Sequence, residues 1–452
     1  MAPMSDAREL NLTLDLCLRV GELLLSSGAG AADVTATMQA VGWQYGVRHA
    51  DIDVTFTSLS MSYQLSPEEP AYVLIRQVKQ RDIDYEDLTL VDHLVRDVLR
   101  GEVELKEART RLARIVSSGH TTPRWLVSLA WGVMCAGVAI LLGGGPVVIA
   151  LAFVAAVCID RLQLWMGRRR LPSFYRQVAG GAVATVIAVL AAAVQDDLDT
   201  SLVVTANIVM LLAGIGFMGA LQDALSGFYV TGGARLTEAL LSTAGIIAGV
   251  SGGLAFAEGI GVDVGRLDPG AVTDLRDVST VALGAAICAA AFAFASYAPR
   301  RSLAPIALIA AIAIVISQSI SQGGVSVART AWPVALAAFF VGLVSFTVAG
   351  RMRVPPLVVV VSAIVPMLPG LSIYRGLSLL SENSYQASEG ILALMTAGSV
   401  ALALASGVIL GEYVAQPVRR EAHRLESRLS GPRLVGPLRT TRRTRRRPQS
   451  NR

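Results

Sequence analysis

Ten apolar blocks of about 20 residues follow one another through most of this chain and limit what it can fold into. A helix rises about 1.5 Å per residue, so a block of this length matches the apolar thickness of a bilayer. The chain is 53% hydrophobic and only 16% charged, whereas soluble domains carry about 25% charged residues. We therefore expect an α-helical polytopic membrane protein of about ten transmembrane helices. The predicted spans are 125–143, 147–165, 174–194, 202–221, 235–256, 280–298, 303–321, 332–350, 355–374 and 390–412.

Residues 1–120 are too polar to cross a membrane and are expected to form a small α+β domain. "LDLCLRVGELLLSSG" has helical spacing and a stop at Gly28, and "AADVTATMQAVGWQYGV" predicts a second helix. "DIDVTFTSLSMSYQL" alternates and predicts one strand, with "AYVLIRQV" as its partner. Residues 85–116 are charged and helical in pattern.

Arginine-rich connections indicate the orientation. They fall between spans two and three, six and seven, and eight and nine, on the side that holds both termini. The positive-inside rule makes that side cytoplasmic. The tail, residues 414–452, predicts a disordered Arg-rich segment that lies on anionic lipids, and nucleic-acid binding is not expected.

The two membrane halves, 121–257 and 278–413, are related by an offset of 156 residues. This offset carries Leu221 onto Leu377 and Tyr229 onto Tyr385. Because each half has five spans, an odd number, the second copy must be inverted relative to the first. Inverted five-helix repeats are an architecture of secondary transporters, whose substrate sites lie where matched helices break.

The fourth and ninth spans are the expected broken helices. The fourth contains Gly214, and the ninth reads "PPLVVVVSAIVPMLPGLSIYRGL", with Pro366, Pro369 and Gly370. Proline lacks an amide hydrogen and clashes with the preceding turn. A half-helix amino end can hold a carboxylate, and free carbonyls can hold a cation.

Asp223 follows the fourth span, and a hairpin rich in glycine separates it from Arg235. An acid within a bilayer usually pairs or faces water, so Asp223 could bind a substrate ammonium, a proton or both, with Arg235 as its partner. The alternative is an ordinary cytoplasmic loop with Asp223 in solvent. Glu238 lies on the same helical face as Arg235. Further candidates are Asn207 in the fourth span and Tyr374 and Arg375 at the end of the ninth.

The sequence has no P-loop, no HExxH motif and no metal-ligand spacing, so we predict a protein that is not an enzyme and has neither cofactor nor metal. Without a nucleotide site, active transport must draw on an ion gradient. Two other classes stay open: a membrane-anchored hydrolase or sensor that acts through the N-terminal domain, and a channel. A homo-oligomer is compatible with the sequence.

Three segments resemble the threonine/serine exporter family. "VGELLLSSGAGAADVTATMQAVGWQYGV" is similar to its opening domain, "GALQDALSGFYVTGGARLTEALL" to the end of its first membrane half, and "IVPMLPGLSIYRGL" to its second half. The resemblance implies an inner-membrane exporter of threonine and serine, driven by the proton motive force. Asp223 and Arg235 match charged family positions, and Pro366, Pro369 and Gly370 match its break. The chain has Ala213-Gly214 where the family often has Pro-Gly, and split relatives associated with dicarboxylate export make succinate-like cargo the alternative.

Overall fold

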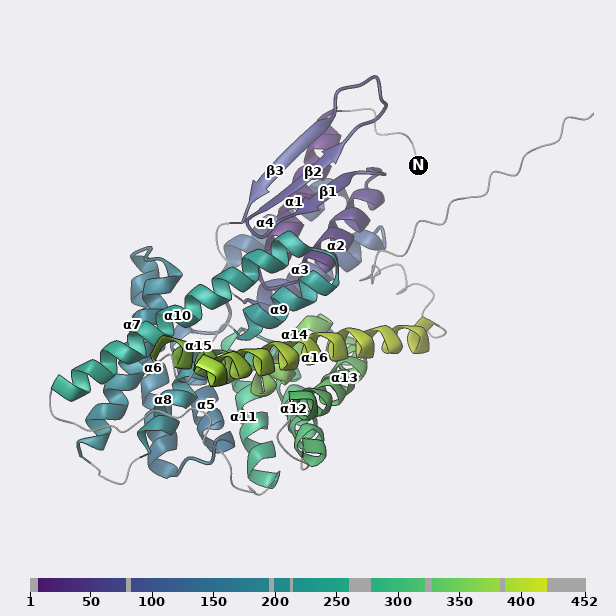
Figure 1. Cartoon of the computed structure of the whole chain (residues 1–452). Coiled ribbons are helices and arrows are strands. Elements are labelled where there is room, and N and C mark those ends of the chain that lie inside the picture. The colour runs from purple at the N-terminus through teal and green to yellow at the C-terminus, as the bar shows by residue number, and fades with distance from the viewer. Residues whose placement is uncertain are drawn as a thin grey trace, which may run out of the picture.

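The computed structural model describes residues 7–78, 83–194, 199–211, 214–259, 278–321, 327–382 and 387–420. Most of the tail expected to lie on lipids, residues 421–452, is outside the described residues, as is Tyr385. An N-terminal region of helices and strands caps one end of a large helical assembly, directly beside α9 and α10 (Figure 1).

The N-terminal region has the predicted α+β content. Its helices are α1 (Ala7–Ser26), α2 (Ala31–Gln44), α3 (Tyr85–Leu99) and α4 (Leu105–Ser118). Helix α1 stops where predicted, because Gly28 adopts φ 95°, a conformation that favours glycine. Helix α3 is capped by Asp84, whose side chain accepts hydrogen bonds from the amides of Glu86 and Asp87.

The sheet has three strands, β1 (Asp51–Val54), β2 (Ser58–Tyr63) and β3 (Tyr72–Gln77), in the antiparallel order β1-β2-β3. The predicted pairing of "AYVLIRQV" is confirmed, with Tyr63 opposite Tyr72. The prediction of one strand over 51–65 is wrong. A turn divides it, closed by a 2.9 Å hydrogen bond from the Thr55 amide to the Ser58 carbonyl.

Eight helices are long and apolar enough to cross a membrane, and two bent helix pairs bring the number to ten within the described residues. Each predicted span coincides with one of them. The unbroken helices are α5 (Arg124–Leu141), α6 (Pro146–Arg168), α7 (Ser173–Ala192), α10 (Tyr229–Gly259), α11 (Val278–Ala295), α12 (Arg300–Ser321), α13 (Val327–Met352) and α16 (Ala387–Arg420). The bent pairs are α8 (Thr200–Leu211) with α9 (Gly214–Leu225), and α14 (Pro356–Ile364) and the short η1 (Val365–Met367) with α15 (Gly370–Glu382).

Glycines bring the backbones of two helix pairs into close contact. In α7 and α10 the neighbours are Gly245 with Phe174, Gly249 with Val178, and Gly253 with Thr185. In α13 and α16 they are Ala335 with Gly407, Phe339 with Gly411, and Gly342 with Glu412. Residue numbers rise together in both sets, so each pair is parallel. Small residues at such contacts allow close packing without intervening side chains.

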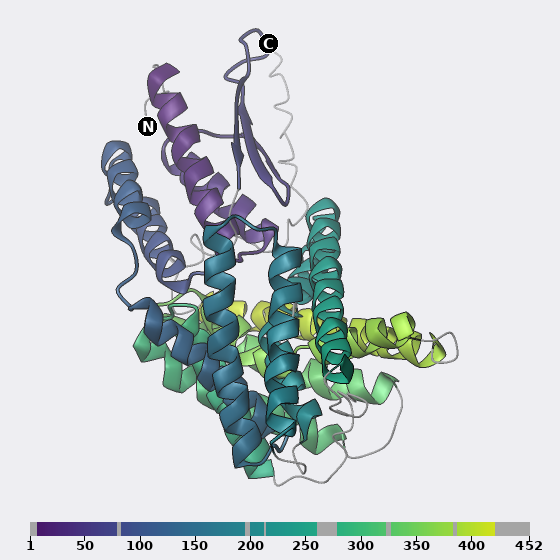
Figure 2. The same cartoon turned by 90° about the vertical axis from the view of Figure 1, so that its left-hand side faces the viewer.

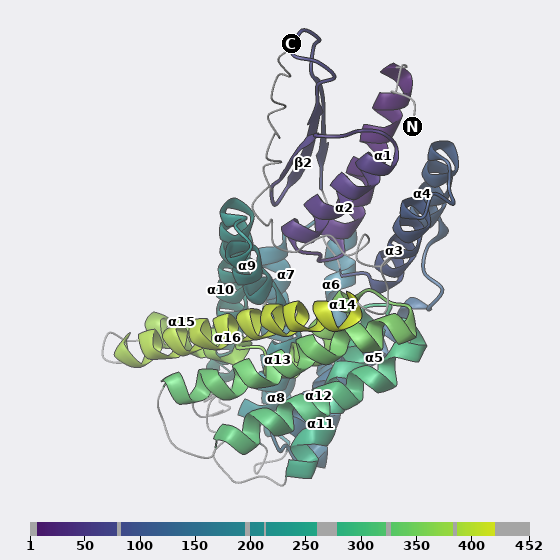
Figure 3. The same ribbon diagram turned by 90° about the vertical axis from the view of Figure 1, so that its right-hand side faces the viewer.

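Helices α5 and α11 pack in the opposite sense. A β-carbon on Gly137 would lie 2.8 Å from the Cys288 amide nitrogen, and one on Gly284 would lie 2.6 Å from that of Leu141. Because one number rises as the other falls, α5 and α11 are antiparallel. In Figures 2 and 3 the blue and teal helices α6, α7 and α10 stand upright, whereas the green and yellow α12, α13 and α16 run across them.

Candidate functional site

Asp223 and Arg235 form a buried ion pair between α9 and α10. The Arg235 Nε lies 3.2 Å from the Asp223 Oδ2, and the two side chains are 11% and 1% exposed. The predicted pairing across the hairpin is therefore confirmed, and the alternative of a solvated Asp223 is wrong. The chain turns back between the helices at Gly227, whose φ is 92°. Gly219 leaves room for the guanidinium, since a β-carbon there would be 2.9 Å from Nη1 of Arg235.

This ion pair binds the amino end of α2. The Ala31 amide donates a 2.9 Å hydrogen bond to Oδ1 of Asp223, and Nη2 of Arg235 donates to the Ala29 carbonyl at 2.9 Å. The first amides of a helix have no acceptor within it, so a carboxylate is favoured there. Thr231 adds a third bond, from its hydroxyl to the Val54 carbonyl at 2.9 Å. The pair thus joins the N-terminal region to the α9–α10 hairpin.

The two bent spans meet at their bends. Helices α8 and α9 differ in direction by 44° across residues 212–213, which lie outside the described residues, and the α14–η1 and α15 segments differ by 45°. The predicted interruption of the ninth span is confirmed, because Pro366 lies in the 3-10 turn and Gly370 begins α15. A β-carbon on Gly214, the first residue of α9, would lie 3.2 Å from the Cβ of Leu368.

The structure does not bring Asp223 to these bends. Asp223 is nine residues after Gly214, about 14 Å along the helix at 1.5 Å per residue. Glu238 is exposed on α10. Tyr374 is buried and Arg375 half-buried on the first turns of α15, and Pro369 is buried between α15 and the 3-10 turn.

Asn207 is fully buried on α8, seven residues before Gly214. Its Nδ2 donates to the Val203 carbonyl at 2.9 Å, and its Oδ1 has no hydrogen-bond partner among the residues that the structure describes. Ser362 on α14, which was not predicted, is also fully buried, and its hydroxyl makes no hydrogen bond of ordinary geometry within the described ranges. One serine in an apolar helix is a weak signal. The repeat offset places the counterpart of Asn207 next to Ser362, and this relation could have identified the serine.

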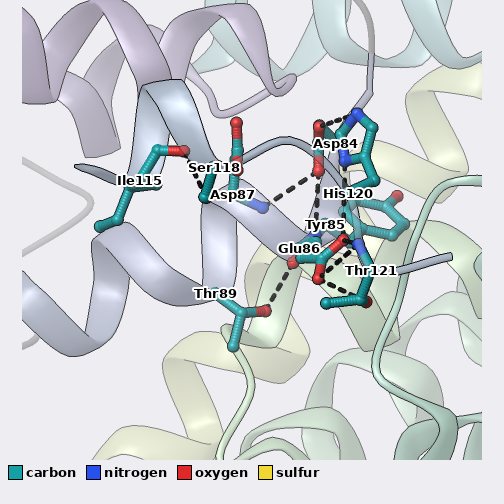
Figure 4. Close-up of polar contacts among 9 residues, drawn as sticks. All are labelled: Asp84, Tyr85, Glu86, Asp87, Thr89, Ile115, Ser118, His120 and Thr121. Atoms are coloured by element: carbon teal, nitrogen blue, oxygen red, sulfur yellow. Dashed lines mark hydrogen bonds and ion pairs between the residues drawn. The ribbon is translucent and has the colours of Figure 1, made fainter. Parts of the chain in front are cut away.

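A second junction ties the N-terminal region to α11. His120 stacks on Tyr297 with ring centroids 3.8 Å apart, and its Nε2 lies 3.4 Å from Asp84. Glu86 accepts a 2.7 Å hydrogen bond from the Thr121 hydroxyl, as Figure 4 shows. Three acids, Asp84, Glu86 and Asp87, lie close together at the amino end of α3. Burial raises the pKa of Asp84, and burial together with the Asp84 charge raises the pKa of Asp87 to about 6.

Tyr85 belongs to the same junction and was not predicted. Its amide donates to the Ser296 carbonyl at 2.8 Å, and its ring packs edge-on against Phe292 of α11, with centroids 6.4 Å apart. Burial raises the pKa of its hydroxyl, and the nearby Ser362 hydroxyl opposes that shift. Within the described ranges no group of three His, Cys, Asp or Glu side chains is arranged to hold a metal ion.

Two family descriptions match nearly all of the membrane-spanning chain. Residues 15–257 match "Putative threonine/serine exporter", and residues 281–414 match "Threonine/Serine exporter, ThrE". The chain belongs to the threonine/serine exporter family. This family of transporters accounts for the apolar helices and makes an enzyme acting through the N-terminal region the weaker interpretation.

Three relatives are similar to this chain over half of its length or more. The "Probable threonine/serine exporter" of Mycobacterium tuberculosis is 35% identical over 427 residues, 93% of this chain and 80% of the relative. The "Threonine/serine exporter" of Corynebacterium glutamicum is 32% identical, over 92% of this chain and 85% of the relative. The "Probable succinate transporter subunit YjjP" of Escherichia coli is 24% identical over 52% of this chain and 91% of the relative. No solved structure matches the chain.

Proposed function

We propose that this protein is a secondary active exporter of L-threonine and L-serine, driven by the proton gradient across the cell membrane. The observation that carries the proposal is the contact between two bent spans at Gly214 and Leu368, in a chain of the threonine/serine exporter family. Interrupted helices leave amides and carbonyls unpaired within a bilayer, which is tolerated where protein, water or cargo satisfies them.

The packing supports an inverted repeat of two five-span halves. Helices α5–α6, α6–α7, α7–α10 and α9–α10 pack together, and so do their counterparts α11–α12, α12–α13, α13–α16 and α15–α16. Thr200 and Pro356 begin the bent spans, and Gly214 and Gly370 begin their second parts, each pair 156 residues apart as predicted. The antiparallel contact of α5 with α11 fits inversion, since these are the first helices of the two halves.

The arginine positions support a cytoplasmic N-terminal region and cytoplasmic termini. Arg301, at the start of α12, donates a 3.1 Å hydrogen bond to the Arg353 carbonyl, between α13 and α14. The His93 ring on α3 lies 3.0 Å from the same carbonyl. Two arginine-bearing connections are thus side by side at the N-terminal region, and the positive-inside rule favours a cytoplasmic location for that side.

The bends offer the two kinds of group that a zwitterion needs. The first amides of α15 have no acceptor within the helix and favour a carboxylate, while carbonyls at the ends of α8 and η1 favour an ammonium. A dicarboxylate would instead need two cationic partners. Arg235 is already paired with Asp223 and the Ala29 carbonyl, so it is a poor candidate for one of them. This occupancy favours an amino acid over succinate.

Asp223 stays the candidate proton carrier. It is a buried acid on the second part of a bent span, and protonation would break its ion pair with Arg235. Proton binding would then loosen the contact with α2 and couple the gradient to movement of the N-terminal region. If Asp223→Asn exports threonine at the parent rate from pH 6 to pH 8, this role is wrong.

Transport into and out of liposomes tests the proposed function. The purified protein is reconstituted with labelled threonine, serine, leucine or succinate, and a pH gradient is imposed. We expect threonine and serine to accumulate against their gradients and a protonophore to abolish accumulation. Movement of succinate alone would establish the alternative cargo. Equilibration of threonine without accumulation would establish a channel, and empty liposomes give the background.

A further inference from the structure

Two buried polar atoms that have no hydrogen-bond partner in the described part of the chain lie at matched places in the two bent spans. Asn207 is seven residues before Gly214, where α9 begins, and Ser362 is eight residues before Gly370, where α15 begins. Both residues are fully buried, and among the described residues neither Oδ1 of Asn207 nor the Ser362 hydroxyl oxygen has a partner at ordinary hydrogen-bond geometry. A buried polar atom without a partner destabilises the fold, so its presence in both halves calls for an explanation.

The repeat relates these two positions. The offset of 156 residues carries Asn207 onto Ala363, the residue directly after Ser362. In an inverted repeat, corresponding positions lie on opposite sides of the meeting point of the bends. Ser362 lies between the start of α14, beside Arg353, and the bend at Leu368, so it is on the cytoplasmic side. Asn207 is then on the outer side.

Tyr85 covers Ser362 from the N-terminal region. Its side chain is 1% exposed, its amide is fixed to the Ser296 carbonyl, and its ring is held against Phe292. Its hydroxyl lies beside that of Ser362, which acts on it as a hydrogen-bonding neighbour, although within the described residues neither oxygen reaches ordinary hydrogen-bond geometry. A buried phenol hydroxyl normally finds a partner, and the Ser362 hydroxyl is the neighbour that Tyr85 has here.

We propose that Ser362 and Asn207 are the polar positions that a small zwitterionic solute contacts on either side of the two bends, and that Tyr85 closes the cytoplasmic entry at Ser362. This inference rests on the proposed export function. Oδ1 of Asn207 accepts a hydrogen bond from the ammonium, and the Ser362 hydroxyl donates one to the carboxylate or exchanges one with a side-chain hydroxyl. Displacing Tyr85 exposes Ser362 to the cytoplasm.

Thiol labelling tests the closure directly and needs no transport. Cys158 is the exposed cysteine of the described residues, and Cys17, Cys135 and Cys288 are buried, so Cys158→Ser provides the background. Ser362→Cys is labelled with a membrane-impermeant maleimide in inside-out vesicles. We expect slow labelling, a rise of at least tenfold in rate with Tyr85→Ala, and no change with Tyr85→Phe, because the ring provides the cover. An equal rate in Tyr85→Ala would overturn the closure.

A matched control separates gating from simple destabilisation of the N-terminal region. Val91 is also a fully buried residue of α3, so Val91→Ala removes core volume without uncovering Ser362. We expect it to leave the labelling rate within twofold of the background. A rise equal to that of Tyr85→Ala would mean general loosening and would overturn the assignment to Tyr85. Tyr85→Leu, which keeps apolar volume, gives an intermediate rate if Tyr85→Ala fails to fold.

Solute protection tests the two polar positions. Threonine is expected to slow labelling of Asn207→Cys from the outer side at least threefold, with leucine and succinate less effective. Ser362→Ala and Asn207→Leu are expected to lower threonine export at least fivefold. Parent-level export in both variants, or no protection by any solute, would mean that ordered water satisfies these atoms and would overturn the site. If the parent exports no threonine, the export proposal fails while the labelling result on Tyr85 still stands.

Discussion

The Ala31 amide and Oδ1 of Asp223 are joined by a 2.9 Å hydrogen bond, although 192 residues separate them in the chain. Through this bond a carboxylate in the first membrane half becomes the N-terminal anion of a helix in the polar region. Arg235 completes the junction, because it forms an ion pair with Asp223 and donates a hydrogen bond to the Ala29 carbonyl. A change at Asp223 therefore affects docking of the N-terminal region as well as any proton chemistry.

Asp223→Asn should destabilise the protein by about 3–5 kcal/mol, the range for losing one partner of a buried ion pair. Asparagine keeps an acceptor for the Ala31 amide but leaves the Arg235 guanidinium without its counter-charge. Thermal unfolding in detergent measures the loss. The double variant Asp223→Asn/Arg235→Gln should recover part of it, and Thr237→Ala, at an exposed position of the same helix, should leave the unfolding temperature unchanged. Additive losses in the double variant would contradict the pairing.

Gly249→Ala should destabilise the first half strongly, because its new β-carbon would overlap the Val178 carbonyl. Forcing α7 and α10 apart costs about 1–3 kcal/mol or more. The matched control is Gly252→Ala on the same helix, where a β-carbon meets nothing within 4 Å; the higher helix propensity of alanine should make that variant equal to the parent or slightly more stable. Yield and unfolding temperature in detergent are the measurements, and equal behaviour of the two variants would refute the close packing.

The contact between the bends predicts a rescue. Gly214→Val should lower threonine export at least tenfold, because the added side chain collides with Leu368, and Leu368→Ala in the same chain should restore part of the rate. Gly216→Ala, whose new atom would lie 3.9 Å from the Ala239 β-carbon, should transport like the parent. Export from preloaded liposomes is the readout. Failure of the second substitution to improve the first would indicate that the bends do not work through this contact.

Asp87 predicts a pH dependence of stability. Burial and the Asp84 charge raise its pKa from 3.8 to about 6, while His120 opposes the shift. The folded protein therefore holds the proton more tightly than the unfolded chain, so this contribution to stability is full below pH 3.8 and is lost as the pH rises through about 6. Asp87→Asn should raise the unfolding temperature at pH 7.

The advantage of Asp87→Asn should shrink as the pH falls toward 4, which unfolding temperatures measured from pH 4.5 to 7.5 would reveal. Glu69→Gln, an exposed acid between β2 and β3, is the control and should follow the parent. If the higher unfolding temperature of Asp87→Asn stays constant with pH, burial does not raise the pKa of Asp87.

The spans could be predicted from sequence because bilayer thickness sets both the length and the apolarity of a crossing helix. The interruption at Pro366 was equally accessible, since proline in a helix interior removes a hydrogen bond and Pro369-Gly370 follow three residues later. The division of β1 from β2 was not, because alternation in the sequence continues through the turn that begins at Thr55. Arg235 was found as the partner of Asp223 by nearness in the chain. Ala31 and Tyr85 were missed because their contacts depend on how the N-terminal region packs against helices that are distant in the chain.

The glycine contacts have a mechanical consequence. Where two backbones touch without side chains between them, as at Gly249 on Val178 and Gly411 on Phe339, no rotamer can change to absorb sliding. Helices α7 and α10 must then move together as one rigid body, and α13 and α16 as another. A conformational change during a transport cycle is thereby concentrated in the two bends, at Gly214 and at Leu368.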